Sequence, residues 1–208
     1  MPPALRARGF SMVELLAVLV ILGILLIVLL PRLRGAQDLA EVKLTRNFLT
    51  QLDGAIAEYE THFGDFPPSQ FIEKWGPPAN GTNVGAEALV LSLWSTEWGG
   101  VGLSEDSLVN TDGDVSKKPL ARFPVPTLFE LSDHWGNPVA YIHRRDYGKT
   151  APYSTADPTT GEPIESNVAA RMNPKTKTYA NPTRYQLISA GQDGQFGTED
   201  DITNFKID

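Results

Sequence analysis

The chain has 208 residues, of which 41% are apolar and 21% charged, with 18 glycines and 16 prolines, values typical of a globular protein rather than a collagen-like or disordered one. Its net charge of −7 argues against a nucleic acid partner, because neutralising phosphates requires clustered Lys and Arg. The absence of cysteine excludes disulfide scaffolds, Cys-ligated zinc, iron–sulfur clusters and thiol nucleophiles.

The first predicted element is a membrane-spanning helix. Residues 12–30 read MVELLAVLVILGILLIVLL, with Glu14 as the single charge. As a helix this stretch covers about 28 Å, close to the roughly 30 Å hydrocarbon thickness of a bilayer. A cleaved secretory signal has a shorter apolar region followed by small residues, whereas Pro31 and Arg32 follow here. We therefore expect a retained single-pass helix, with a cleaved signal or a buried core helix as the alternatives.

Glu14 is not explained by a plain anchor, because a carboxylate in lipid is costly unless it finds a partner. The sequence around it, MPPALRARG followed by FSMVELL, resembles the type III signal of type IV pilins and type II secretion pseudopilins. The resemblance implies cleavage after Gly9 by a prepilin peptidase and N-methylation of Phe10. It also implies that Glu14 pairs with the Phe10 amine of a neighbouring subunit in a filament; the alternative is that Glu14 snorkels to the membrane edge.

These assignments divide the chain into a cytoplasmic leader (residues 1–9), a transmembrane and filament-core helix (10–31) and a periplasmic head (32–208) that includes the upper half of the helix. Two arginines stand on each side of the apolar stretch, so positive-inside counting does not settle its orientation. A location in the inner membrane, with the head in the periplasm, is therefore implied by the resemblance.

Helical periodicity continues beyond Pro31, because apolar residues recur at steps of three and four while charged residues occupy the other faces. The predicted apolar stripe comprises Leu33, Ala36, Ala40, Leu44, Phe48, Leu52, Ile56, Tyr59 and Phe63. Gly64 and the prolines after it are typical of a helix end. We expect one helix from Phe10 to Phe63, kinked at most by Pro31.

The middle of the chain predicts little regular structure. Glycine and proline interrupt residues 69–126 repeatedly, and only residues 86–94 (AEALVLSLW) predict a short helix. Residues 110–114 (NTDGD) lack the remaining ligands of an EF-hand, so we interpret them as a solvated turn. Residues 146–183, rich in Pro, Thr, Asn and Gly, predict a surface insertion with at most one ragged hairpin.

Strand signals at residues 139–143 and 185–189 predict a small antiparallel sheet. The turn before the first strand, residues 133–138 (DHWGNP), resembles a turn of the major pseudopilins, with His134 in place of a proline. The expected fold class is therefore α+β: a long N-terminal helix packed on a small antiparallel β-sheet head with long loops, as in pilins.

The C-terminal segment, residues 189–205, holds four acidic residues and three glycines but no Lys or Arg. This composition favours a calcium loop, because like charges repel unless a cation lies among them. The segment also resembles the calcium loop of the major pseudopilins. The resemblance implies Asp193 as leading ligand, Asp200 and Asp201 from the far arm, and the Ala190 carbonyl; loop geometry adds Gln195. The alternative is a solvated turn without an ion.

Motifs for catalysis are missing: the three histidines lack metal-ligand spacing, and no G-x-S-x-G or phosphate loop occurs. We therefore expect a non-enzymatic, structural subunit of a type II secretion pseudopilus. The resemblance implies a homo-oligomeric filament that drives protein export across the outer membrane. It implies as partners prepilin peptidase, minor pseudopilins, the inner-membrane secretion platform, and membrane lipid before assembly. The alternatives are a subunit of a type IV or competence pilus, and a membrane-tethered enzyme or binding module.

Overall fold

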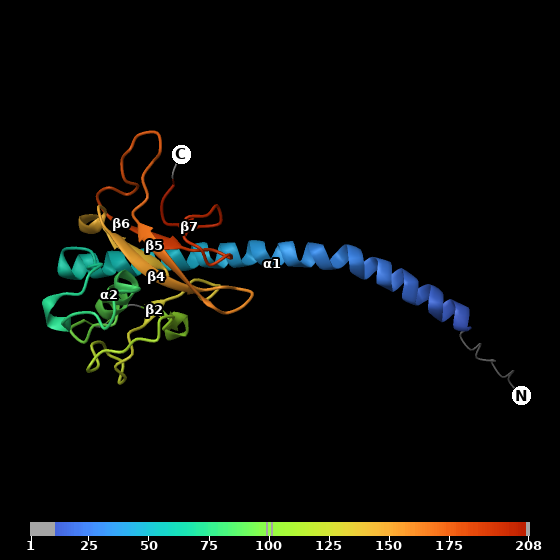
Figure 1. The fold of residues 1–208 in the computed structure, drawn as a ribbon, viewed down its shortest axis with the longest axis horizontal. Coiled ribbons are helices and arrows are strands. Elements are labelled where there is room, and N and C mark those ends of the chain that lie inside the picture. The colour runs from blue at the N-terminus through green and yellow to red at the C-terminus, as the bar shows by residue number, and fades with distance from the viewer. Residues whose placement is uncertain (1–10, 99, 101, 207–208) are drawn as a thin grey trace, which may run out of the picture. The chain divides into compact units, whose positions relative to one another are not determined.

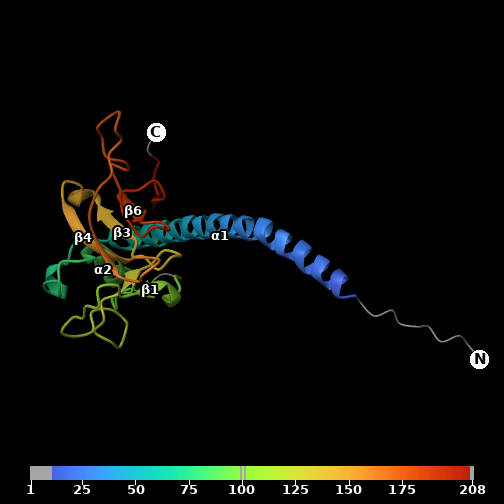
Figure 2. The ribbon, with the colours of Figure 1, turned by 45° about the vertical axis from the view of Figure 1, so that its right-hand side comes forward.

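The computed structural model describes residues 11–98, 100 and 102–206, and the side chains of all of these except 28–37. Its internal contacts divide the chain into two compact units, Met1–Ala40 and Glu41–Asp208. The second unit contains α2 and all the strands, which are labelled in Figures 1 and 2. The architecture is α+β with small antiparallel sheets, as predicted.

Helix α1 (Met12–Phe63) runs through Pro31 without interruption and ends where the sequence predicts. The next residue, Gly64, has a φ of 79°, and its N–H donates to the Glu60 carbonyl at 2.7 Å. Glycine reaches this left-handed conformation without steric cost, so it ends the helix. The predicted start at Phe10 lies outside the described residues.

Within the second unit, α1 buries Leu49, Leu52 and Ile56, whereas Leu44 is 47% exposed. The predicted stripe is therefore wrong at Leu44, by one helical position, and also at Ala40 and Phe63, which are exposed. The reason at Leu44 is the residue 133–138 turn, which packs on this helix. His134 N–H donates to Thr45 Oγ1 at 3.2 Å, so polar Thr45 takes the buried position. The predicted stripe residues Leu33 and Ala36 have side chains outside the described part of the chain.

The main sheet has the order β3-β6-β7 and is antiparallel throughout. Its strands are β3 (Ala140–His143), β6 (Tyr185–Ser189) and β7 (Ile202–Thr203), which confirms the two strands predicted from sequence. Side chains alternate between the faces of a strand. Tyr141, Tyr185 and Leu187 join the core formed with α1, and Ala140, Ile142 and Ile188 join a second core on the other face.

The second core is completed by a hairpin of β4 (Thr150–Ala156) and β5 (Pro163–Ala169), seen in front of the main sheet in Figure 1. Tyr153 is 1% exposed and Val168 is 3% exposed, and both pack in this core. The predicted hairpin is therefore present, but the prediction that it lies only on the surface is wrong. Although the hairpin is mostly polar, its strand register places these two buried side chains on the same face.

Helix α2 (Val84–Leu93) confirms the short helix predicted in the middle of the chain, and every residue in it is buried. Two short strands, β1 (Leu108–Val109) and β2 (Glu130–Leu131), pair beside it. Single 3-10 turns complete the fold: η1 (Glu73–Trp75), η2 (Glu105–Ser107) and η3 (Arg144–Asp146).

Candidate functional site

Two residues of the predicted N-terminal signal, Gly9 and Phe10, lie outside the described residues. The third, Glu14, is exposed on the first turn of α1. Its Oε2 accepts the Ser11 N–H at 2.9 Å, and its own N–H donates to Ser11 Oγ at 3.3 Å. This reciprocal pair is a capping box, which satisfies two of the N–H groups that a helix start leaves free.

The first turns of α1 expose large apolar side chains on all sides. Exposed fractions run from 83% for Met12 to 45% for Val18, and Ile27 is 74% exposed. A continuous apolar surface of this extent marks a region that other apolar groups must cover. Among the residues with described side chains, no helix meets the length and apolarity that a membrane span requires.

The C-terminal loop is folded tightly by glycines. Gly191 and Gly194 both have a φ of 69°, and Gly197 has a φ of 105°. A Cβ on Gly191 would lie 2.5 Å from the Asp200 carbonyl oxygen, so the two arms of the loop approach closely there. Asn137 Nδ2 donates to the Gly191 carbonyl at 2.9 Å, which joins the loop to the 133–138 turn.

The predicted ligands occupy different environments in this loop. Asp200 Oδ2 accepts the Asp193 N–H at 3.0 Å, and Asp193 Oδ1 accepts the Gln195 N–H at 2.7 Å. Burial raises the pKa of Asp200, but hydrogen bonds from the Thr198 hydroxyl and the Asp193 N–H outweigh it and lower that pKa below its usual value. Ala190 is fully buried, and Gln195 is exposed. Asp193, Asp200 and Asp201 do not bring three carboxylate oxygens within 4.8 Å of one another in the described structure.

Asp201 is paired with a cation that the sequence of the C-terminal segment does not contain. Arg171, which follows β5, forms an ion pair with Asp201 Oδ2, so a cation from outside residues 189–205 reaches the acidic loop. Asp201 Oδ1 is buried and has no hydrogen-bond partner among the described residues. The orphaned oxygen and the closely approaching arms of the loop would suit a cation, whereas the other oxygen of Asp201 is already paired with Arg171.

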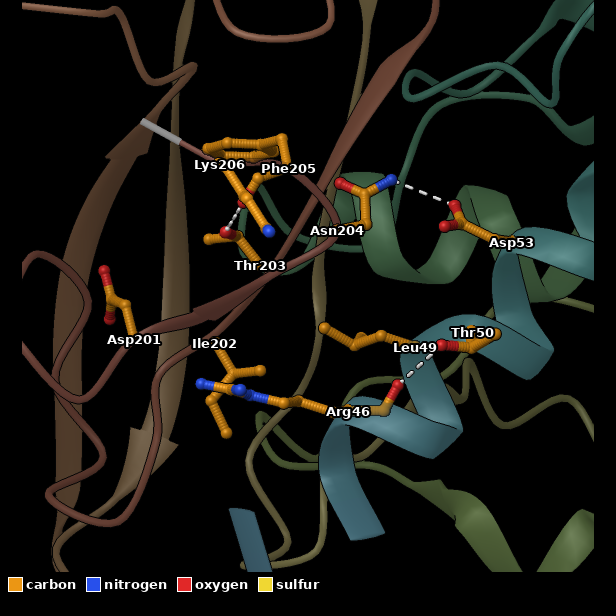
Figure 3. A pocket seen from close by; sticks show the side chains of 10 residues that line it. All are labelled: Arg46, Leu49, Thr50, Asp53, Asp201, Ile202, Thr203, Asn204, Phe205 and Lys206. Carbon is orange, nitrogen blue, oxygen red and sulfur yellow. Dashed lines mark hydrogen bonds between the residues drawn. The ribbon is translucent and has the colours of Figure 1, made fainter. Parts of the chain in front are cut away.

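A groove of about 510 Å³ lies between α1 and the C-terminal segment (Figure 3). Asp53 Oδ1 on α1 accepts hydrogen bonds from Asn204 Nδ2 at 2.9 Å and from the Tyr185 hydroxyl at 2.7 Å. The Asp53 carboxylate therefore holds the C-terminal segment and the start of β6 on the helix. The groove therefore lies at a contact that stabilises the fold of the second unit.

Sequence reasoning missed a second acidic cluster. Glu87, Asp112 and Glu130 each place a carboxylate oxygen within 4.8 Å of the other two. Asp114, in the same turn as Asp112, is only 9% exposed, so the interpretation of residues 110–114 as a solvated turn is wrong at Asp114. The available signal was Glu87, a lone charge inside the apolar run of α2.

The chain is similar to known proteins both in its N-terminal motif and over nearly its whole length. Residues 5–30 match the family model described as the prokaryotic N-terminal methylation motif. The chain is similar to the type II secretion system core protein G of Escherichia coli (strain K12), with 23% identity over 202 residues, 97% of this chain and 93% of that protein. The core protein G of Aeromonas hydrophila is 22% identical over 202 residues, 97% of this chain and 94% of that protein.

The resemblance to type II secretion pseudopilins is confirmed. The core protein G of Klebsiella pneumoniae is 32% identical over a shorter stretch of 65 residues, 31% of this chain and 46% of that protein. No solved structure matches the chain significantly. In this pseudopilin-like chain, the methylation motif includes Gly9, Phe10 and Glu14, and it precedes the head formed by the sheets and α2.

Proposed function

We propose that this chain is a structural subunit of a type II secretion pseudopilus. The observation that carries the proposal is a methylation motif at the start of an exposed apolar helix, in a chain similar to core protein G over nearly its whole length. The role requires self-association and includes no catalytic step. Because the apolar side chains of the helix need a cover, lipid provides it before assembly and neighbouring subunits provide it afterwards.

The proposed route begins at the inner membrane. A prepilin peptidase removes residues 1–9 on the cytoplasmic side, and Phe10 becomes the methylated N-terminus. Residues 10–31 then span the membrane once, with residues 32–208 in the periplasm. The apolar helices leave the membrane as they bundle into a homo-oligomeric filament, with minor pseudopilins and the inner-membrane platform as partners.

Glu14 would set the register of that filament. In the processed chain, the Phe10 amine and Glu14 stand four positions apart on one helix face. Glu14 is exposed, and its Oε2 already accepts one N–H from Ser11, so the carboxylate is oriented at the helix start. An amine from a neighbouring chain would add a charge-assisted hydrogen bond to it in a water-poor surrounding, where such bonds are strong.

The C-terminal loop would bind calcium as a structural ion. The groups available to hold it are the Asp193, Asp200 and Asp201 carboxylates, the Ala190 carbonyl and Gln195. An oxygen-only set of this kind suits calcium, which takes six to eight oxygen ligands. The ion would neutralise the acidic loop and join its two arms beside the sheet.

The assembly proposal is tested with Glu14→Ala in a bacterium that carries the secretion system and prepilin peptidase. We expect the variant to be cleaved and to remain in the membrane, but to be absent from sheared filaments, because it lacks the partner for the Phe10 amine. Cleavage is measured by mass spectrometry and assembly by immunoblotting of the sheared fraction. Filaments at wild-type abundance would show that Glu14 does not set register.

Two further variants separate processing from assembly. Gly9→Leu should leave the uncut precursor in the membrane, because the peptidase requires a small residue at the cut. Glu58→Ala removes an exposed carboxylate elsewhere on α1 and should assemble normally. Normal maturation of Gly9→Leu would contradict the signal assignment.

The calcium loop is tested with Asp193→Asn in the full chain in detergent micelles. Binding of an ion of the extracellular class stabilises the folded state by about 1–2 kcal/mol at several millimolar calcium. We therefore expect calcium to raise the melting temperature of Asp193→Asn less than that of the wild type. Glu162→Gln, which neutralises an exposed carboxylate in the β4–β5 turn, serves as control. Equal calcium shifts in all three chains would refute this site.

A further inference from the structure

Four carboxylates meet beneath α2, outside the C-terminal loop. Glu87 comes from α2, Glu130 from β2, and Asp112 and Asp114 from the turn after β1. One oxygen each of Glu87, Asp112 and Glu130 lies within 4.8 Å of the other two. Oxygens that bind one calcium ion at 2.3–2.6 Å lie at most about 5 Å apart. The three carboxylates therefore have the spacing of ligands around a single ion.

The Glu87 side chain supplies an independent observation. Its exposed fraction is 0%, and neither carboxylate oxygen has a hydrogen-bond partner among the described residues. Both Asp114 carboxylate oxygens are likewise buried and unpartnered. Burying a carboxylate without donors costs several kcal/mol, because the group loses its hydration and receives nothing in return. Glu87 points this unsatisfied group at Asp112 and Glu130.

The surrounding charges add to the cost. The charged groups that act on Glu87 are Asp112, Asp114 and Glu130, all of them negative. Burial and these neighbours raise the pKa of Glu87 well above that of an ordinary glutamate, and burial raises the pKa of Glu130 to about 8. In the described part of the chain, none of the four carboxylates forms an ion pair.

Two of the carboxylates are held in place by neutral donors. Asn83 Nδ2 donates to Glu130 Oε1 at 2.9 Å, and the Thr111 N–H donates to Glu130 Oε2 at 3.2 Å. Asn80 Nδ2 donates to Asp112 Oδ2 at 3.0 Å. Asn83 lies at the N-cap position of α2 with a φ of 55°, an uncommon conformation for a residue other than glycine, and its side chain makes no capping hydrogen bond. The oxygens are thus positioned before any ion arrives, which reduces the ordering cost of binding.

We propose that Glu87, Asp112 and Glu130, with Asp114 as a further ligand, bind a calcium ion that ties α2 to the 110–114 turn and to β2. Hard oxygen ligands without nitrogen or sulfur favour calcium or magnesium over zinc. Magnesium demands near-ideal octahedral geometry and keeps several of its waters, whereas calcium accepts irregular sets of protein oxygens, so a cluster of buried carboxylates suits calcium. Asp112 is only half-buried and provides the route of entry.

The alternative explanation for the buried carboxylates is that Glu87 carries a proton and no ion is bound. If Glu87 is protonated, it donates to Asp114, and the pair is satisfied without an ion. The two accounts differ in their response to calcium, since a shared proton gives no calcium binding at neutral pH. They also differ for Glu87→Gln, whose amide donates in place of the proton and preserves stability only if no ion is bound.

The experiment uses the full chain in detergent micelles, stripped with a chelator and carrying Asp193→Asn to disable the C-terminal loop. Calcium is titrated by calorimetry, and melting temperatures are measured with and without it. We expect this chain to bind calcium and to melt higher in its presence. Adding Asp112→Asn should weaken calcium binding at least about tenfold, because affinity follows the number of charged ligands. Adding Glu162→Gln should change nothing.

Glu87→Gln in the same background should also lose the calcium-dependent rise in melting temperature. If that variant does not fold, as far-UV circular dichroism would show, Asp112→Asn decides, because its side chain is half-buried in a turn. The proposal is overturned if the Asp193→Asn chain binds no calcium, or if Asp112→Asn binds it as tightly as its parent. The outcome is separate from filament assembly, which Glu14→Ala tests.

Discussion

Gly85, at the start of α2, governs how closely this helix approaches the sheet. A Cβ at this position would lie 2.3 Å from the Tyr141 carbonyl oxygen and 2.6 Å from the Tyr153 hydroxyl oxygen. The Tyr153 hydroxyl in turn accepts the Tyr141 N–H at 3.2 Å. No larger side chain fits there without moving the backbone. The close approach of α2 to β3 therefore depends on glycine, which carries only a hydrogen atom at this position.

We predict that Gly85→Ala lowers the free energy of unfolding by at least about 1–3 kcal/mol, the usual cost of overpacking. Thermal denaturation of the full chain in detergent measures the change. Gly54→Ala is the matched control, because Gly54 lies within α1 and has nothing within 4 Å of its added Cβ. It should raise stability by up to about 1 kcal/mol. Equal effects of the two substitutions would contradict the close packing.

At the residue scale, the sequence predicts only part of the environment of the candidate calcium ligands. Composition pointed to an acidic loop around Asp193, and the structure finds that loop closed on itself by positive-φ glycines. The ion pair of Asp201 with Arg171 joins residues 30 positions apart, so no local pattern predicts it. The calcium assignment stays a prediction for the experiments above.

At the scale of elements, α1 shows how packing selects a helix face. The apolar pattern allows either of two neighbouring seams, one through Leu44 and one through Leu49. The 133–138 turn decides between them, since Trp135 Nε1 donates to Glu41 Oε2 at 2.8 Å and His134 N–H donates to Thr45. These polar contacts place Leu49 in the core at 2% exposure.

We predict that Leu49→Ala lowers the free energy of unfolding by about 2–5 kcal/mol, because it leaves a cavity in the core. Leu44→Ala makes the same chemical change on the same helix, at a position that is 47% exposed. It should change stability by no more than about 0.5 kcal/mol. Melting curves of the full chain in detergent, monitored by near-ultraviolet circular dichroism, distinguish the two. A larger loss of stability for Leu44→Ala than for Leu49→Ala would instead support the buried helix face predicted from sequence.

The β4–β5 hairpin is an element whose importance the sequence concealed. It supplies Tyr153 and Val168 to the second core, which covers the face of the main sheet opposite α1. Covering both faces explains why all four residues of β3 are buried. The elements outside the pilin-like helix and sheet are therefore part of the folded core.

At the scale of the whole molecule, a buried histidine connects the end of α1 to the sheet. His143, on β3, is 2% exposed; its Nδ1 accepts the Arg145 N–H at 3.1 Å, and its Nε2 lies 3.6 Å from Asp65 Oδ1. Burial lowers the pKa of His143, and Arg144 and Arg145 act in the same direction, whereas Asp65 opposes them. The fold therefore favours the neutral imidazole.

We predict a loss of stability in mild acid that depends on His143. Because the folded pKa lies below the unfolded value of about 6.5, the unfolded chain takes up the proton first, and stability falls as pH drops below that value. One such group contributes at most about 1.4 kcal/mol per pH unit. The buried carboxyls beneath α2, with raised pKa, act in the opposite direction.

The measurement is therefore a difference. The melting temperatures of wild type and His143→Gln are compared between pH 7.5 and 5.5, where the carboxyl contributions are common to both chains. We expect the gap between them to narrow towards pH 5.5. A gap independent of pH would mean that His143 is protonated alike in the folded and unfolded chains.

The sequence by itself determined the long helix and its end at Phe63, the short buried helix, the two central strands and the N-terminal signal. These features depend on local periodicity, on turn residues and on a contiguous motif, all of which are present in a short stretch of chain.

Tertiary structure alone decided the register of α1 in the core, the burial of the hairpin and the Arg171–Asp201 pair. It also brought Glu87 and Glu130 together from separate elements. Each of these depends on contacts between distant residues, where the energetics of burial select one arrangement among several that local sequence allows. Asp112 and Asp114, which the sequence assigned to a solvated turn, join this acidic cluster because the fold brings their turn against α2 and buries Asp114.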